Sequence, residues 1–462
     1  MKHNKIAEST QAKAANQLLT RASPLVMLAP LNFRRGSPLR TILYSCTAVA
    51  LSVMSTFAVA SAAKEQSGSR AESGSKADPA SELVPEKITE KVSAKFATNF
   101  FKLAAKETDK NVVISPYSIS TALSMTYNGA IGRTKSEMQQ VLGFEGLSDE
   151  AVNKQNANLY RSLMQVNPLS ELAIANALFA KANVVFKQNF INTNQKYYGA
   201  KLETLNFATA NSSAINRIND WVKENTQGKI PTILDKLPKD AILYLVNAVY
   251  FKGTWLNEFK KSATQPADFK LDNGSKKSVQ MMNRSAKMLH LQGDNFQAVI
   301  LPYKDNRLQM CVFLPSEKSN IATLIARFNE QNWQQWISKF SNKQGHLALP
   351  RFKVEYKSEL SKLLNQAGMP CAFNEDCAEF KKMIDQDVFI SRVLHKTYLE
   401  VNERGTEAAA ATAVEMMPRG AAFNPTPPFN MVCDRPFVIA IRDQQTGAIL
   451  FMGAIVDPPN AI

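Results

Sequence analysis

Apolar residues in the first half of the chain recur at helical spacing. The first predicted helix has a buried face made of Ile88, Val92, Phe96 and Phe100. A short buried strand at 111–116 ends at Pro116 and leads into an apolar helix at 117–129. A later helix, which Gly228 ends, has a face made of Ile215, Ile218, Trp221 and Val222. The early part of the chain is therefore expected to be mainly helical.

Strand patterns dominate from residue 240 onward. Apolar or alternating runs predict strands at 240–251, 297–301, 308–314, 437–441 and 449–456. Turn residues Lys304-Asp305-Asn306 join the second and third runs, so these two are expected to form a hairpin. A turn at 443–447 joins the last two runs in the same way. No polar linker interrupts this order after residue 86, which predicts one α+β domain over residues 86–462.

The segment at 403–420 carries two conflicting patterns. Residues 397–401, just before it, alternate at strand spacing with β-branched and aromatic side chains. Thr406 and the residues up to 411, Glu followed by four Ala, instead match the start of a helix. Both interpretations stay open from this segment alone, which suggests a sequence able to adopt two structures. The segment ends in Pro418-Arg419-Gly420, which a trypsin-like protease would cleave.

Residues 1–62 have the marks of an export signal. Three arginines at 34–40 precede an apolar run at 41–59, and small residues at 60–62 match a cleavage site. A membrane anchor is the alternative, because the run is close to spanning length. Its Ser and Thr content and its Ala-x-Ala ending favour cleavage, so we expect a secreted or periplasmic protein that does not span a membrane. Residues 63–85, rich in Ser, Gly and charge, are expected to form a flexible tether.

Composition and charge narrow the class of protein. With 462 residues, 45% hydrophobic and 21% charged, the chain has a composition that is typical of a soluble globular protein. Seven Lys or Arg and one Glu in residues 1–62 account for +6 of the +15 formal charge. The remaining basic residues are scattered, so no nucleic-acid partner is expected. Cys311 and Cys433 lie in apolar strands and should be buried thiols, whereas Cys371 and Cys377 flank a short loop and are candidates for a local disulfide.

The groups that catalysis would need form no recognisable pattern. His290, His346 and His395 are the histidines after residue 62, and none belongs to a metal-binding motif. The chain has no Gly-x-Ser-x-Gly nucleophile elbow, no phosphate-binding glycine loop and no dinucleotide fingerprint. The sequence therefore predicts no enzyme, no bound metal and no cofactor. His395 follows apolar residues and is expected to be a core histidine with a buried polar partner.

Several motifs together resemble the serpin family. They are NVVISPYSIS at 111–120, LVNAVYFKGTW at 245–255, NERGTEAAAAT at 402–412, DRPF at 434–437 and LFMG at 450–453. They occur in the family's order between about residue 88 and Pro458, and their combination is highly specific. The resemblance implies an α+β serpin fold, with three β-sheets, eight or nine helices and an exposed reactive loop near the C-terminus.

The resemblance also implies a mechanism. A protease attacks the reactive loop as a substrate, and the loop inserts into the main sheet before the acyl-enzyme is hydrolysed. The protease is dragged away and distorted, and the two proteins stay in a covalent complex. The inhibitor is consumed in this process, so it must be metastable beforehand. We expect it to act as a monomer without a cofactor.

Loop positions follow by counting from the hinge residue Glu403. They place the scissile bond at Arg419–Gly420, and Arg419 would fill the acidic pocket of a trypsin-like serine protease. A cut at Met417 would instead suit chymotrypsin-like or elastase-like enzymes, and cysteine proteases are a further alternative. A non-inhibitory serpin that binds or carries a ligand is the second class. The hinge, whose small uncharged side chains can be buried, comprises Gly405, Thr406, Ala408, Ala409, Ala410, Ala411 and Thr412.

Six residues outside the loop match further family positions. The hydrogen-bonded cluster beneath the sheet opening is matched by Ser115, Ser118, Asn247 and His395. Trp255 resembles the aromatic residue where the loop first enters, and Arg351 resembles the partner of Glu403 in an ion pair that closes this opening. Each of these residues also has a purely structural interpretation.

Overall fold

The computed structural model of the chain describes residues 85–106, 109–164, 170–207, 211–238, 241–406 and 427–459. All of them belong to one compact unit. The expected export segment 1–62 lies outside these residues, as does the tether 63–85 except for Pro85. Within the described ranges, no helix combines the length and apolar character needed to cross a membrane.

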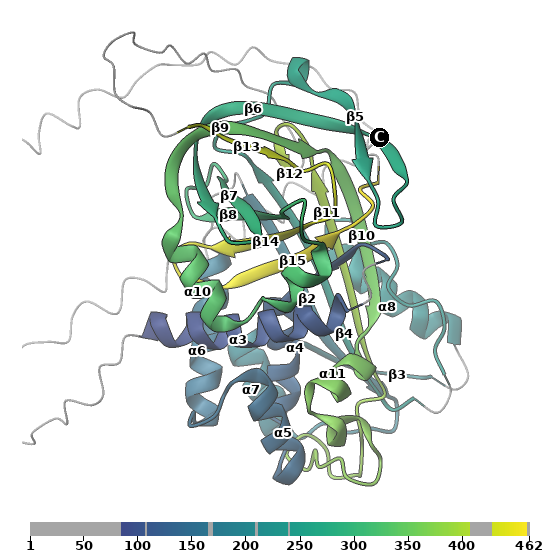
Figure 1. The fold of residues 1–462 in the computed structure, drawn as a ribbon. Helices are drawn as coiled ribbons and strands as arrows, with labels where there is room; N and C mark the ends of the chain where they lie inside the picture. The colour runs from purple at the N-terminus through teal and green to yellow at the C-terminus, as the bar shows by residue number, and fades with distance from the viewer. Residues whose placement is uncertain are drawn as a thin grey trace, which may run out of the picture. The chain divides into compact units, whose positions relative to one another are not determined.

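Nine α-helices lie in the described residues, and five of them, α3 to α7, gather beneath one end of the sheets in Figure 1. The expected helix around Phe96 and Phe100 is confirmed, and both side chains are buried. The helices are α3 (Pro85–Ala104), α4 (Pro116–Tyr127), α5 (Gly132–Leu142), α6 (Asp149–Met164), α7 (Gln188–Tyr198), α8 (Asn211–Asn225), α9 (Ile321–Ala326), α10 (Glu330–Lys339) and α11 (Ser361–Ala367).

A six-stranded sheet carries the strand next to the predicted reactive loop. Strand β11 pairs in parallel with β4, from Arg392 opposite Tyr244 to Tyr398 opposite Tyr250. The short β12 pairs with the far end of β4 in the antiparallel sense. The strands are, in spatial order, β10 (Phe352–Glu359), β11 (Arg392–Val401), β4 (Leu243–Thr254), β2 (Ser170–Lys181) and β3 (Lys201–Leu205), with β12 (Gly405–Thr406) beside β4.

The other strands form a nine-stranded sheet, in which both expected hairpins are confirmed as β7–β8 and β14–β15. The described strands thus form two hydrogen-bonded networks where the family resemblance implied three sheets. The nine strands form a single network because the 17-residue β6 pairs with β5 at one end, with β7 at the other and with β9 between. The strands are β1 (Val112–Ile114), β15 (Ile449–Ile455), β14 (Phe437–Asp443), β8 (Leu308–Pro315), β7 (Phe296–Pro302), β6 (Lys276–Gln292), β9 (Ser341–Pro350), β13 (Phe429–Val432) and β5 (Gln265–Lys270).

Side chains of β4 alternate between the two faces of the six-stranded sheet. Val249 and Phe251 pack between the two sheets. Ala248 and Tyr250 point to the opposite face, where they join a core formed with α8. This alternation follows from the period of two along a strand, and it defines an inner face toward the second sheet and an outer face toward α8. The helix α8 lies at the right of Figure 1.

Candidate functional site

The chain reverses direction where β11 ends. Asn402 N–H donates to Gly405 O (2.8 Å), and Gly405 N–H donates to Asn402 O (3.2 Å). After the turn, Gly405 lies opposite Thr254 and Thr406 opposite Gly253. Gly405 has a φ of 144°, and a Cβ there would lie 2.0 Å from Gly253 O, so only glycine fits. Gly405 and Thr406 therefore lie alongside β4, just beyond the point where β11 stops pairing with it.

Trp255 fastens this turn to β4. Its backbone N–H donates to Arg404 O (2.8 Å), and its indole Nε1–H donates to Asn402 O (3.0 Å). The indole is 1% exposed and stacks on the Tyr303 ring at a centroid distance of 4.5 Å. Trp255, which the sequence predicts to lie where the loop enters the sheet, thus contacts the backbone of the residues around the hinge.

Glu403 and Arg351 are brought together beside the turn. An oxygen of the buried Glu403 carboxylate lies 3.7 Å from Arg351 Nη1. The same oxygen accepts a 2.9 Å hydrogen bond from Thr264 Oγ1, a residue that the sequence did not single out. The main chain is also held, because Phe259 N–H donates to Glu403 O (2.7 Å). The carboxylate therefore links three separate segments of the chain at this end of the sheet.

A cluster of polar side chains lies on the inner face of the six-stranded sheet and consists of Ser115, Ser118, Asn247 and His395. Asn247 and His395 are register partners on β4 and β11, and His395 Nδ1 is hydrogen-bonded to Asn247 Oδ1. Asn247 Nδ2 donates to Ser118 Oγ and to Asn176 Oδ1. Ser115 N–H donates to His395 Nε2 (3.2 Å), which ties β11 to the start of α4. The cluster therefore spans β2, β4, β11 and α4.

Burial fixes the protonation state of His395. The ring is fully buried, and desolvation lowers its pKa to about 3. Because Nε2 accepts a hydrogen bond from Ser115, the single ring hydrogen is on Nδ1, which then donates to Asn247. Asn176 completes this network, and the sequence signal that could have identified it is its position as a lone amide in an apolar run at 172–180.

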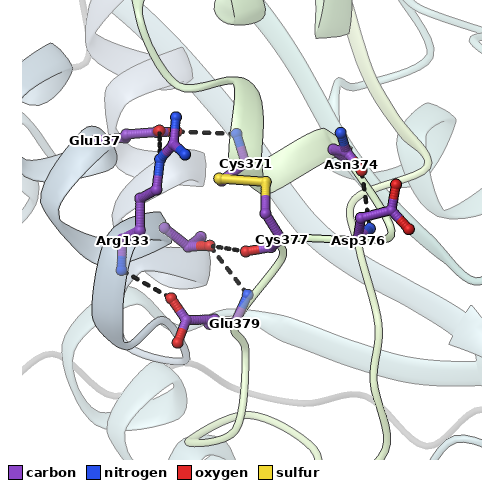
Figure 2. The surroundings of a disulfide bond; sticks show 8 residues. Arg133, Glu137, Cys371, Asn374, Asp376, Cys377 and Glu379 are labelled. Atoms are coloured by element: carbon purple, nitrogen blue, oxygen red, sulfur yellow. Dashed lines mark hydrogen bonds and ion pairs between the residues drawn. A yellow bond between two sulfur atoms is a disulfide. The ribbon is translucent and has the colours of Figure 1, made fainter.

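Cys371 and Cys377 form a disulfide in the segment that connects α11 to β11 (Figure 2). The loop rests on α5 through two carboxylates. Glu137 Oε2 accepts from Cys371 N–H (2.9 Å), and Glu379 Oε2 accepts from Arg133 N–H at the start of α5 (2.8 Å). The disulfide loop is thus hydrogen-bonded to α5 at both ends of the sulfur bridge.

The remaining cysteines are buried thiols, as expected. Burial raises the pKa of Cys311 to about 12, and it also raises the pKa of Cys433. Neither thiol is therefore ionised near neutral pH. Across the described ranges, no cluster of His, Cys, Asp and Glu has the grouping needed to hold a metal ion.

Part of the expected reactive loop lies in residues 407–426, outside the described residues. This stretch contains the hinge positions Ala408, Ala409, Ala410, Ala411 and Thr412 and the expected reactive bond Arg419–Gly420. The structure places the hinge residues Glu403, Gly405 and Thr406 at the turn described above.

Comparison with known proteins decides the family. A family model described as "Serpin (serine protease inhibitor)" matches residues 91–458. The chain belongs to the serpin family. The description of the family is that of protease inhibitors rather than of enzymes, and the mixed α+β fold agrees with the expected one.

Individual relatives cover nearly the whole serpin domain. Serpin B6 of Pongo abelii is 35% identical over 378 residues, which is 80% of this serpin and 100% of the relative. Leukocyte elastase inhibitor of Homo sapiens is 34% identical over 387 residues, or 79% of this serpin and 98% of the relative.

Solved structures of other proteins superpose on most of the chain. Tengpin, a thermophilic serpin in its native state, has a TM-score of 0.74 at 30% identity and covers 84% of this serpin and 96% of tengpin. Human thyroxine-binding globulin, solved as a complex, has a TM-score of 0.74 at 27% identity over 82% and 100% of the two chains.

Proposed function

We propose that this serpin is a suicide inhibitor of a trypsin-like serine protease. Cleavage at Arg419–Gly420 releases the loop, which then inserts along the seam between β4 and β11. The observation that carries this proposal is β12, because its two residues already pair with β4 in the antiparallel sense at the upper end of that seam. The rest of the loop has only to extend the same pairing.

Extension of the β12 register predicts which loop residues would become buried. Continuing from Thr406 opposite Gly253, residue 408 would lie opposite Phe251 and residue 410 opposite Val249. Residue 412 would lie opposite Asn247, between that side chain and His395. These partners face the inner side of the sheet. The loop supplies Ala408, Ala410 and Thr412 there, so insertion would bury neither a bulky side chain nor a charge.

The length of the loop suits the displacement that inhibition requires. From Thr406 to Arg419 there are 13 residue steps, which span roughly 43 Å in a strand at about 3.3 Å per step. Strand β4 has 12 residues and offers a partner along most of this length. A protease acylated at Arg419 would therefore be carried to the opposite end of the sheet.

Arg419 supports a trypsin-like target, since its guanidinium would bind the carboxylate of an acidic specificity pocket. A cut at Met417 is the alternative. The similarity to a leukocyte elastase inhibitor supports an elastase-like protease as the target in that case. A carrier role is the second class, because human thyroxine-binding globulin has a similar fold. The small residues of the hinge favour inhibition over that role.

We further propose that the protein is exported. The support is the basic, apolar and small-residue order of residues 1–62. The disulfide between Cys371 and Cys377 adds to it, because such bonds persist mainly in oxidising compartments.

Incubation with trypsin tests the inhibitory function. The expected result is a covalent complex that survives boiling in SDS, together with a released C-terminal peptide that begins at Gly420. The variant Arg419→Glu should form no complex with trypsin, whereas the matched control Met417→Glu should form it normally. A nicked loop beside fully active trypsin would show that the protein is not an inhibitor of this enzyme. If only Met417→Glu failed to form the complex, the reactive bond would be assigned to Met417 instead of Arg419.

A further inference from the structure

A cluster of aromatic and basic side chains crosses the β4–β11 seam on its outer face. Tyr250 of β4 and Tyr398 of β11 are register partners, with ring centroids 5.9 Å apart at an interplanar angle of 62°. The Lys229 ammonium lies 5.8 Å from the Tyr250 centroid and 5.9 Å from that of Tyr398. One cation therefore contacts the faces of two rings that belong to different strands. We call Lys229, Tyr250 and Tyr398 the latch.

The backbone of Lys229 is held above the seam by the segment that follows α8. Gly228, with a φ of 76°, turns the chain at the helix end, and Lys229 N–H donates to Thr226 O (2.9 Å). A few residues later, Thr232 O accepts from Lys396 Nζ of β11 (3.0 Å). The segment 226–238 is thereby anchored on α8 and on β11, so Lys229 does not depend on its own side-chain contacts for its position.

The latch lies at the point that insertion must open first. Tyr250 and Tyr398 form the last register pair of the β4–β11 ladder, and Thr406 of β12 is paired with Gly253, three residues further along β4. Continued pairing would place residue 409 between the two tyrosines. Neighbouring strands are about 4.8 Å apart, so an added strand would separate these two backbones by roughly 9.6 Å. Lys229 could then no longer contact both rings.

We propose that the latch holds the seam closed and sets the rate at which the loop inserts. This inference rests on the proposed inhibitory function. The rate matters because an acyl-enzyme that waits too long is hydrolysed, and the serpin is then turned over as a substrate. Lys353 also contacts Tyr398, with its ammonium 5.0 Å from the ring centroid, but it lies on β10, on the same side of the seam as Tyr398, and so does not bridge the two strands. Lys229 acts through the two strands it bridges and is therefore a positioning residue.

Uptake of a synthetic loop peptide measures seam opening without any protease. A peptide with the sequence of residues 404–417 is added to the uncleaved full-length protein, and its incorporation is followed on native gels. The variant Lys229→Met, which keeps the length of the side chain and removes its charge, should take up the peptide about tenfold faster, equivalent to about 1.4 kcal/mol. Lys229→Arg keeps the cation and should stay within about twofold of the original protein. So should Lys223→Met, which removes an exposed charge from the last turn of α8.

The stability of the loop-cleaved form shows whether Lys229 acts as part of the latch or only contributes to packing in general. After cleavage and insertion the latch is already open, so Lys229→Met should leave the unfolding midpoint of the cleaved form unchanged. Equal uptake rates in Lys229→Met and Lys229→Arg would overturn the proposal. So would an equal loss of stability in the native and cleaved forms of Lys229→Met. If the original protein takes up no peptide at all, the proposed insertion mechanism fails, and the latch fails with it.

Discussion

Asn247 uses every polar atom of its side chain in the closed sheet. Its oxygen accepts from His395, and its nitrogen donates to Ser118 and Asn176. No donor faces a donor, provided that the His395 ring is neutral. An added proton on Nε2 would point at the Ser115 N–H and break this match. The cluster is therefore a satisfied buried network at the middle of the seam, and its arrangement depends on one protonation state.

The native protein should lose stability as the pH falls from about 6.5 toward 3. The pKa of His395 is about 3 in the folded protein, and an unfolded histidine has a pKa of about 6.5. Below that value the unfolded chain binds a proton that the folded chain does not, at a cost of about 1.4 kcal/mol per pH unit. Urea unfolding at pH 7.5 and pH 4.5 should therefore show a smaller pH dependence in His395→Gln than in the original protein, by up to about 3 kcal/mol.

His346 provides the control for this measurement. It lies on β9, outside the cluster, where its Nδ1 is 3.1 Å from Ser285 Oγ. His346→Gln should retain the pH dependence of the original protein. If His395→Gln also retains it in full, His395 is not the group responsible.

Single residues of the site could be identified from the sequence only where a motif marked them. Ser115, Ser118, Asn247 and His395 stand in motifs that resemble the family, and the structure brings them together. Asn176 and Thr264 stand in no such motif, although each completes a hydrogen-bonded group. Their roles depend on which strand lies beside them, and the local sequence pattern does not predict pairing between distant segments.

Among the described elements, the two-residue strand β12 determines how the loop would be oriented on insertion. Its pairing with β4 fixes the side on which each later loop residue would lie if the same register continued. On insertion, even-numbered residues from Ala408 onward would face the inner core, and odd-numbered residues would face α8. A one-residue change of register would reverse this assignment, so the register itself is open to test.

Charge substitution at the hinge residue Thr406 and at its neighbour Glu407 tests that register. In Thr406→Arg the insertion would bury a guanidinium on the inner face, at a cost of several kcal/mol. Trypsin should still cleave the loop, but the yield of covalent complex should fall by more than about tenfold. Glu407→Arg places the same charge on the outer face and should keep most of the inhibition. The yields are compared on SDS gels, and full inhibition by Thr406→Arg would contradict the insertion register.

Local patterns predicted the individual elements better than their assembly. The hairpins β7–β8 and β14–β15 follow from turn residues between apolar runs, because both strands and the turn are close in sequence. The union of nine strands through β6 did not follow from any pattern. Residues 276–292 form one unbroken strand, and only their distant partners on β5, β7 and β9 decide which sheet they belong to.

At the scale of the whole molecule, the seam is a parallel ladder that an antiparallel strand can replace. Seven register pairs join β4 to β11 in parallel, an arrangement slightly less stable per residue than antiparallel pairing. The inserted loop would run antiparallel to both strands, so one parallel ladder would give way to two antiparallel ones. The native fold is therefore expected to be less stable than the cleaved, inserted fold.

Thermal unfolding before and after loop cleavage tests this claim most directly. A strand of about 13 residues that gains on the order of 10 kcal/mol should raise the melting temperature by at least about 20 °C. The measurement compares the intact protein with the same protein cut in the loop at residues 417–420, with both fragments retained. A large rise is the predicted result. An unchanged melting temperature after complete cleavage would mean that the loop stays outside the sheet, and it would contradict the inhibitory mechanism.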